Sequence, residues 1–185
     1  MSDFNFASRA GEKLQFALDQ FQISVKDKIC ADLGSSTGGF VSCLLMNGAS
    51  KVYSVDTSYG ELAWTLRNDS RVVVKERTNA LHVELPEKVD IVTIDVGWTK
   101  QALILPHALS LLKNDSLVIS LIKPHYEADK KLIRKGKLPD ENLEQVLKDM
   151  NENLERLNIK FEKIIESPIV GKRGGNKEML GLIRR

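Results

Sequence analysis

The sequence predicts an α/β domain, in which helices cover both faces of a mostly parallel sheet of seven strands. Three observations support this fold class. Short apolar runs alternate with amphipathic helical stretches along the chain. The first such run leads into a glycine-rich turn, ADLGSSTGGF at residues 31–40, which opens a helix. Later runs end in a carboxylate or a lysine, which is typical of sheets that bind ligands beyond the carboxyl ends of parallel strands.

The spacing of apolar residues assigns five helices and seven strands. Leu14, Ala17, Leu18 and Phe21 recur at helical intervals, whereas short runs rich in β-branched residues indicate strands. The expected helices cover residues 9–21, 38–47, 60–67, 102–112 and 140–157. The expected strands cover residues 29–33, 51–56, 72–75, 89–95, 117–122, 160–167 and 178–183, with the last two as an antiparallel pair.

Composition is that of an ordinary globular domain, with 42% hydrophobic and 28% charged residues. We expect residues 1–185 to form one domain, with residues 1–7 as a flexible start. Cys30 and Cys43 lie in apolar patterns and are expected to be reduced core residues. No secretory signal and no membrane-spanning run is recognisable, so we expect a cytoplasmic protein without membrane contact. His82, His107 and His125 share no metal-ligand spacing, and no metal site is expected.

The glycine turn and the next strand end together indicate the ligand. A dinucleotide site would show G-x-G-x-x-G, whereas Gly34 and Gly38 lie four residues apart. Asp56 closes the second strand, where a carboxylate can accept hydrogen bonds from ribose hydroxyls. With Asp32, this pattern favours an adenosine that carries an amino-acid tail over a diphosphate. S-adenosylmethionine is such a molecule.

Polar residues follow several of the predicted strands. These are Gly34, Asp56, Asn79, Asp95 and Lys123. Because the carboxyl ends of parallel strands meet at one edge of a sheet, we expect these five residues to converge on one crevice.

Six motifs in this order give the chain a resemblance to a known family. They are SRAGEKL (8–14), DLGSSTGGF (32–40), ERTN (76–79), IDV (94–96), LIKP (121–124) and GNKE (175–178). The combination resembles the FtsJ-type RNA ribose 2′-O-methyltransferases, and within them the TlyA branch, which is often labelled hemolysin-like. The resemblance covers residues 8–184 and implies a Rossmann-like, class I S-adenosylmethionine-dependent methyltransferase fold.

The resemblance also implies a catalytic tetrad and a cofactor site. The tetrad carries over to Lys13, Asp95, Lys123 and Glu178. Lys123 is the candidate to orient or deprotonate the acceptor hydroxyl, with the carboxylates holding the two lysines. The residues expected at the cofactor are Gly34, Ser35, Ser36, Gly38, Gly39, Asp56, Asn79 and Asp95. The substrate implied is ribosomal RNA or a ribosomal subunit.

Two basic segments flank the expected crevice and are candidates for holding RNA phosphates. Their cations are Lys130, Lys131, Arg134, Lys135, Lys172 and Arg173. TlyA-type proteins carry an S4-like RNA-binding domain ahead of the methyltransferase, and this sequence reaches the Lys13 motif within a few residues. We therefore expect that the RNA is selected with the help of a partner or such a domain, or that this chain binds RNA weakly. Two alternatives stay open, namely a methyltransferase acting on a small molecule and a non-catalytic, hemolysin-like protein that binds S-adenosylmethionine or RNA.

Overall fold

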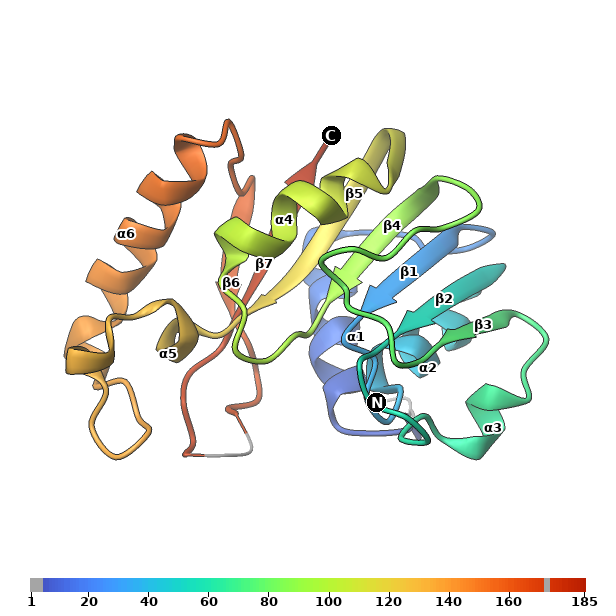
Figure 1. The fold of residues 1–185 in the computed structure, drawn as a ribbon, viewed down its shortest axis with the longest axis horizontal. Helices are drawn as coiled ribbons and strands as arrows, with labels where there is room; N and C mark the ends of the chain where they lie inside the picture. The colour runs from blue at the N-terminus through green and yellow to red at the C-terminus, as the bar shows by residue number, and fades with distance from the viewer. Residues whose placement is uncertain (1–4, 172–173) are drawn as a thin grey trace.

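Seven strands form one sheet in the computed structural model, which describes residues 5–171 and 174–185 (Figure 1). The strands are β1 (Ile29–Leu33), β2 (Lys51–Val55), β3 (Val72–Lys75), β4 (Val89–Ile94), β5 (Leu112–Ile122), β6 (Lys163–Glu166) and β7 (Met179–Arg184). Their order is β3-β2-β1-β4-β5-β7-β6. The first five are parallel, and β7 is antiparallel to both β5 and β6. The predicted fold class and the antiparallel closing pair are confirmed.

Helices cover both faces of the sheet (Figure 1). The α-helices are α1 (Ala10–Phe21), α2 (Gly39–Met46), α3 (Trp64–Arg67), α4 (Gln101–Ser110), α5 (Pro124–Glu127) and α6 (Leu143–Glu155), and η1 (Lys130–Leu132) and η2 (Asp140–Asn142) are 3-10 turns. One apolar layer joins α1 and α2 to the sheet, and a second joins α4 and α6 to the opposite face. Neighbouring residues of β1, Cys30 and Ala31, belong to different layers, as the alternation of side chains along a strand requires.

Two of the expected elements differ from the structure by several residues in ways that have a clear physical reason. The helix predicted over residues 60–67 is confined to α3, because Gly60 has a φ of 78° and its N–H donates to Glu76 Oε1 at 2.8 Å. The strand predicted from residue 117 begins at Leu112, which pairs with Val89. The register between β4 and β5 then shifts before Leu117, so apolar patterning alone did not reveal the first part of the strand.

Both ends of the described chain are anchored to the core. Phe6 and Ala7 pack against the layer around α1 and α2, and Ala7 N donates to Ser42 Oγ at 3.1 Å. The flexible start expected for residues 1–7 stays a prediction.

Cys30 and Cys43 are buried and unpaired, and burial raises the pKa of the Cys30 thiol to about 12. Over residues 5–171 and 174–185, no helix combines the length and the apolar character needed to cross a membrane.

Candidate active site

A cavity of about 720 Å³ opens at the carboxyl edge of the parallel strands. It is lined by residues that follow β1, β4 and β5, by the start of α1 and by the segment that leads into β7. All four residues of the expected tetrad line it, namely Lys13, Asp95, Lys123 and Glu178. Because β7 is antiparallel to β5, Glu178 lies just before a strand and still reaches the edge at which the parallel strands end.

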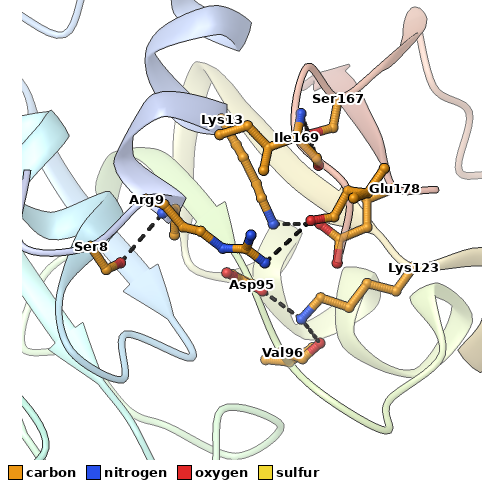
Figure 2. Close-up of polar contacts among 11 residues, drawn as sticks. Ser8, Arg9, Lys13, Asp95, Val96, Lys123, Ser167, Ile169 and Glu178 are labelled. Atoms are coloured by element: carbon orange, nitrogen blue, oxygen red, sulfur yellow. Dashed lines mark hydrogen bonds and ion pairs between the residues drawn. The ribbon is translucent and has the colours of Figure 1, made fainter. Parts of the chain in front are cut away.

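Lys13 and Glu178 form a buried ion pair on one side of this cavity (Figure 2). Lys13 projects from α1 and is 5% exposed, and Glu178 is 4% exposed. The Lys13 ammonium donates to Glu178 Oε2. The segment that leads into α1 packs closely on the start of α2, since a Cβ on Gly39 would lie 2.3 Å from Ser8 Oγ. This packing places Lys13 of α1 at the cavity. Each charge neutralises the other, as burial of either one demands.

Lys123 and Asp95 form a second pair, which is more accessible (Figure 2). Lys123 Nζ lies 2.6 Å from Asp95 Oδ1 and donates to the carbonyl oxygen of Val96 at 3.2 Å. Asp95 follows β4 and Lys123 follows β5, and these neighbouring strands are parallel. The side chains are 17% and 21% exposed, so this pair can meet a ligand in the cavity.

Arg9, His125 and Tyr126 also line this cavity, although the sequence interpretation did not select them. Arg9 Nη2 donates to the carbonyl oxygen of Val170 at 3.2 Å. The rings of His125 and Tyr126 lie 4.1 Å apart. Their closeness in sequence to Lys13 and Lys123 was the one available signal.

Asp32 lies at the floor of the cavity, where it is 1% exposed. Its Oδ1 accepts from Thr93 Oγ1 at 2.7 Å, while Oδ2 has no hydrogen-bond partner within the described part of the chain. Burial raises the pKa of Asp32 to about 7, and the nearby Asp95 carboxylate adds to the rise. A buried acidic oxygen that lacks a donor is suited to a ligand that brings a cation or an N–H group.

The glycine turn forms the wall between β1 and α2. Gly34 has a φ of 91°, and a Cβ there would lie 2.5 Å from the carbonyl oxygen of Asp95. Gly34, Ser35, Ser36 and Gly39 line the cavity, but Gly38 does not. Gly38 is the N-cap of α2, without a side-chain cap bond. The helix therefore begins one residue later than expected. Ser35 Oγ donates to the carbonyl oxygens of residues 32 and 55.

A second cavity of about 640 Å³ adjoins the first and shares Gly34, Ser36 and Asp95 with it. Asp56 and Asn79, the other residues expected at the cofactor, line this second cavity. Asp56 Oδ2 accepts from the N–H of Ser36 at 2.7 Å, and Oδ1 accepts from the N–H of residue 58 at 2.8 Å. The expected cofactor residues are thus spread over two joined cavities, with Asp95 lying between them.

The basic residues expected to hold RNA phosphates belong to two segments that contact each other. Lys130, Lys131, Arg134 and Lys135 are exposed. The buried side chain of Asn176 links their segment to the one before β7: it accepts from the N–H of residue 138 at 2.9 Å and donates to the carbonyl oxygen of residue 136 at 3.0 Å. Lys172 and Arg173 lie outside the described residues. Elsewhere, in 5–171 and 174–185, no group of His, Cys, Asp and Glu side chains could hold a metal ion.

Comparison with known proteins agrees with this arrangement. Residues 6–184 match the model of the FtsJ-like methyltransferase family. The "Putative rRNA methyltransferase YqxC" of Bacillus subtilis (strain 168) is 46% identical over 154 residues, 78% of this chain and 54% of that protein. The "16S/23S rRNA (cytidine-2'-O)-methyltransferase TlyA" of Mycobacterium tuberculosis is 42% identical over 139 residues, 73% of this chain and 52% of that protein.

A solved structure described as "Putative hemolysin from Streptococcus thermophilus" superimposes with a TM-score of 0.92 at 34% identity. The superposition includes 100% of this chain and 68% of the solved one. The chain spans about half the length of the two curated relatives, 54% and 52%. The family model matches nearly the whole sequence, and the chain belongs to the FtsJ-like methyltransferase family.

Proposed function

We propose that this chain is an S-adenosylmethionine-dependent methyltransferase that modifies the ribose 2′-hydroxyl of RNA, with ribosomal RNA as the substrate. The observation that carries the proposal is the convergence of two lysine–carboxylate pairs in the cavity formed by the glycine turn. The two curated relatives described above, which are named as rRNA methyltransferases, support the choice of substrate. A ribosomal substrate would also place the protein in the cytoplasm.

The residues present fit S-adenosylmethionine. The unpartnered Oδ2 of Asp32 suits the ammonium of an amino-acid tail. The absence of a side chain at Gly34 lets the turn approach the backbone of Asp95 closely, so that both line the cavity. Asp56 and Asn79 line the adjoining cavity, where the ribose and adenine would lie. When bound, the cofactor supplies a methyl group on a positively charged sulfur.

Lys123 is proposed to orient the acceptor hydroxyl. An ammonium has three N–H donors, and two of those on Lys123 are engaged by Asp95 and the carbonyl oxygen of Val96. The third remains for the 2′-hydroxyl oxygen. Fixing a weak nucleophile in line with the methyl group would lower the barrier by positioning. As the oxygen gains the methyl group, its proton would become acidic and would pass to solvent water.

The Lys13–Glu178 pair is proposed to shape the acceptor side of the cavity. Both groups are buried and mutually neutralised, so they keep a fixed geometry beside the reaction. The exposed cations of residues 130–135 would hold RNA phosphates at the rim. Because these contacts are few, we propose that selection of the RNA also involves an S4-like domain or a separate RNA-binding partner.

Transfer of label from S-adenosylmethionine tests the proposal. The protein is incubated with labelled cofactor and undermethylated ribosomal subunits, free ribosomal RNA or a metabolite extract, and the labelled fraction is then identified. We expect label on the RNA, at a 2′-oxygen. Label only in the metabolite fraction would favour the small-molecule alternative, and no label together with cofactor binding would favour the non-catalytic one.

A further inference from the structure

His125 is a residue of the candidate active site to which neither the tetrad nor the cofactor residues give a role. It is the second residue of α5 and follows Lys123 by two positions. Its ring lines the same cavity as Lys13, Asp95, Lys123 and Glu178. The ring of Tyr126 lies 4.1 Å from it, and the ring of Trp98 lies 4.9 Å from that of Tyr126. The imidazole therefore packs on the Tyr126 ring, which in turn packs on the ring of Trp98.

The two nitrogens of this imidazole have different surroundings. Within the described residues, two buried side-chain nitrogen or oxygen atoms lack a hydrogen-bond partner: Nδ1 of His125 and Oδ2 of Asp32. Both belong to residues that line this one cavity. Nε2 is not among the buried unpartnered atoms, so it is the nitrogen of His125 that a ligand can reach.

This environment selects the protonation state of the ring. Burial lowers the pKa of His125, and the positive charge of Lys123 lowers it further. The imidazolium would need a proton on Nδ1, which would be a buried donor without an acceptor and is among the rarest arrangements in folded proteins. The neutral ring with its proton on Nε2 avoids this penalty, so Nε2 is a hydrogen-bond donor.

The positively charged side chains of the cavity each have at least one protein acceptor. Lys13 donates to Glu178, Lys123 is paired with Asp95, and Arg9 donates to the carbonyl oxygen of Val170. The Nε2–H of His125 has no protein acceptor in the described chain. It is thus a neutral donor on a residue that lines the cavity in which the acceptor group would lie.

We propose that His125 binds the acceptor nucleotide by donating from Nε2 to a sugar-phosphate oxygen beside the target hydroxyl. This inference rests on the proposed function, because it names a contact to the RNA that the enzyme would methylate. A ring whose one reachable nitrogen carries a proton cannot accept the proton of the hydroxyl there. His125 is therefore a substrate-binding residue and not the base.

Two substitutions separate the donor from the ring. His125→Phe keeps the packing on Tyr126 and removes both nitrogens, whereas His125→Gln keeps an N–H donor near the position of Nε2. His82 is exposed and lines neither cavity, so His82→Phe is the matched control. Methyl transfer to RNA gives kcat and KM, filter binding gives the Kd for RNA, and calorimetry gives the Kd for S-adenosylhomocysteine.

We expect His125→Phe to raise KM and Kd for RNA about five- to tenfold, with kcat within about twofold. We expect His125→Gln and His82→Phe to stay within about twofold of the wild type, and all four proteins to bind S-adenosylhomocysteine equally. Unchanged RNA binding by His125→Phe, a loss of kcat in both His125 variants, or weaker cofactor binding would each overturn the inference. A wild-type protein that labels no RNA would instead overturn the proposed function and this contact with it.

Discussion

Replacing Asp32 by asparagine tests the electrostatics of the buried floor of the active site. Asp32 is 1% exposed, and its pKa lies at about 7 against 3.8 for the ordinary value. A carboxyl whose folded-state pKa is raised destabilises the fold as the pH rises from the unfolded value to the folded one, because only the unfolded chain ionises freely there. A rise of about three pKa units lowers the free energy of unfolding by about 4 kcal/mol above pH 7, and about 1.6 kcal/mol of this loss is already present at pH 5.

The amide introduced by Asp32→Asn would carry no charge and could still accept the hydrogen bond from Thr93. Without cofactor, this variant should therefore unfold with a higher free energy than the wild type, and the difference should grow by about 2.5 kcal/mol from pH 5 to pH 8. Urea titrations of both proteins at four pH values measure this, and subtracting one from the other cancels the remaining titrating groups. Parallel stability curves over this range would refute the reasoning.

The same substitution should weaken binding of S-adenosylhomocysteine, because the ammonium of the ligand loses its proposed carboxylate partner. In the wild type, ionised Asp32 is the form that binds, so affinity should rise about tenfold between pH 5.5 and pH 7. Isothermal calorimetry in buffers of different ionisation enthalpy should detect the proton released on binding. A variant that is more stable and also binds normally would show that Asp32 is not the partner of the ligand ammonium.

Three further predictions concern the tetrad and the rim. Lys123→Ala should reduce methyl transfer to RNA at least a hundredfold with an unchanged cofactor Kd. Lys123→Arg should not restore activity, since a guanidinium cannot reproduce a compact ammonium with one free donor. Near-normal turnover by Lys123→Ala would show that Lys123 takes no part in the chemistry. Lys13→Ala should lower the free energy of unfolding by about 3–5 kcal/mol, because Glu178 is left buried and unpaired. The double variant Lys13→Met with Glu178→Leu should recover this stability in urea titrations but should not recover activity. Recovered activity in the double variant would show that the pair is purely structural. The exposed basic residues expected to hold RNA phosphates are Lys130, Lys131, Arg134 and Lys135. Replacing all four by alanine should reduce the slope of log K for RNA binding against log salt concentration by about three to four units, without changing cofactor binding. An unchanged slope would exclude these residues from the RNA interface.

The parts of the fold that sequence predicted best are those with one dominant local signal. The strands at Ile29–Leu33 and Val72–Lys75 were predicted to the residue, because both are short apolar runs bounded by polar turns. The helix expected before α3 failed because the left-handed backbone at Gly60 interrupts it. A local pattern carries no information about the tertiary hydrogen bond from Gly60 to Glu76.

The candidate site divides in the same way. Residues in recognisable motifs, such as Lys13 and Glu178, were selected although 165 positions separate them. The unpartnered oxygen of Asp32 and the unpartnered nitrogen of His125 were not foreseen. They are defined by the absence of a neighbour in space, and neither residue type nor spacing encodes such an absence. The link that the Asn176 side-chain amide makes between two loops could not be predicted either, because its partners are backbone atoms, whose positions no residue type encodes.

The polarity of the last strand has a consequence for anything joined to this chain. Ser8, Arg9 and Ala10 line the reaction cavity, so the polypeptide emerges at its rim on the N-terminal side. On the other side, Arg184 pairs with Leu117, one strand length away from the edge where Met179 pairs with Ile122 (Figure 1). Six residues of strand span about 20 Å. A nucleic-acid-binding module tethered ahead of residue 5 would raise the local concentration of RNA at the cavity mouth, whereas one tethered after residue 185 would need a linker long enough to traverse the sheet.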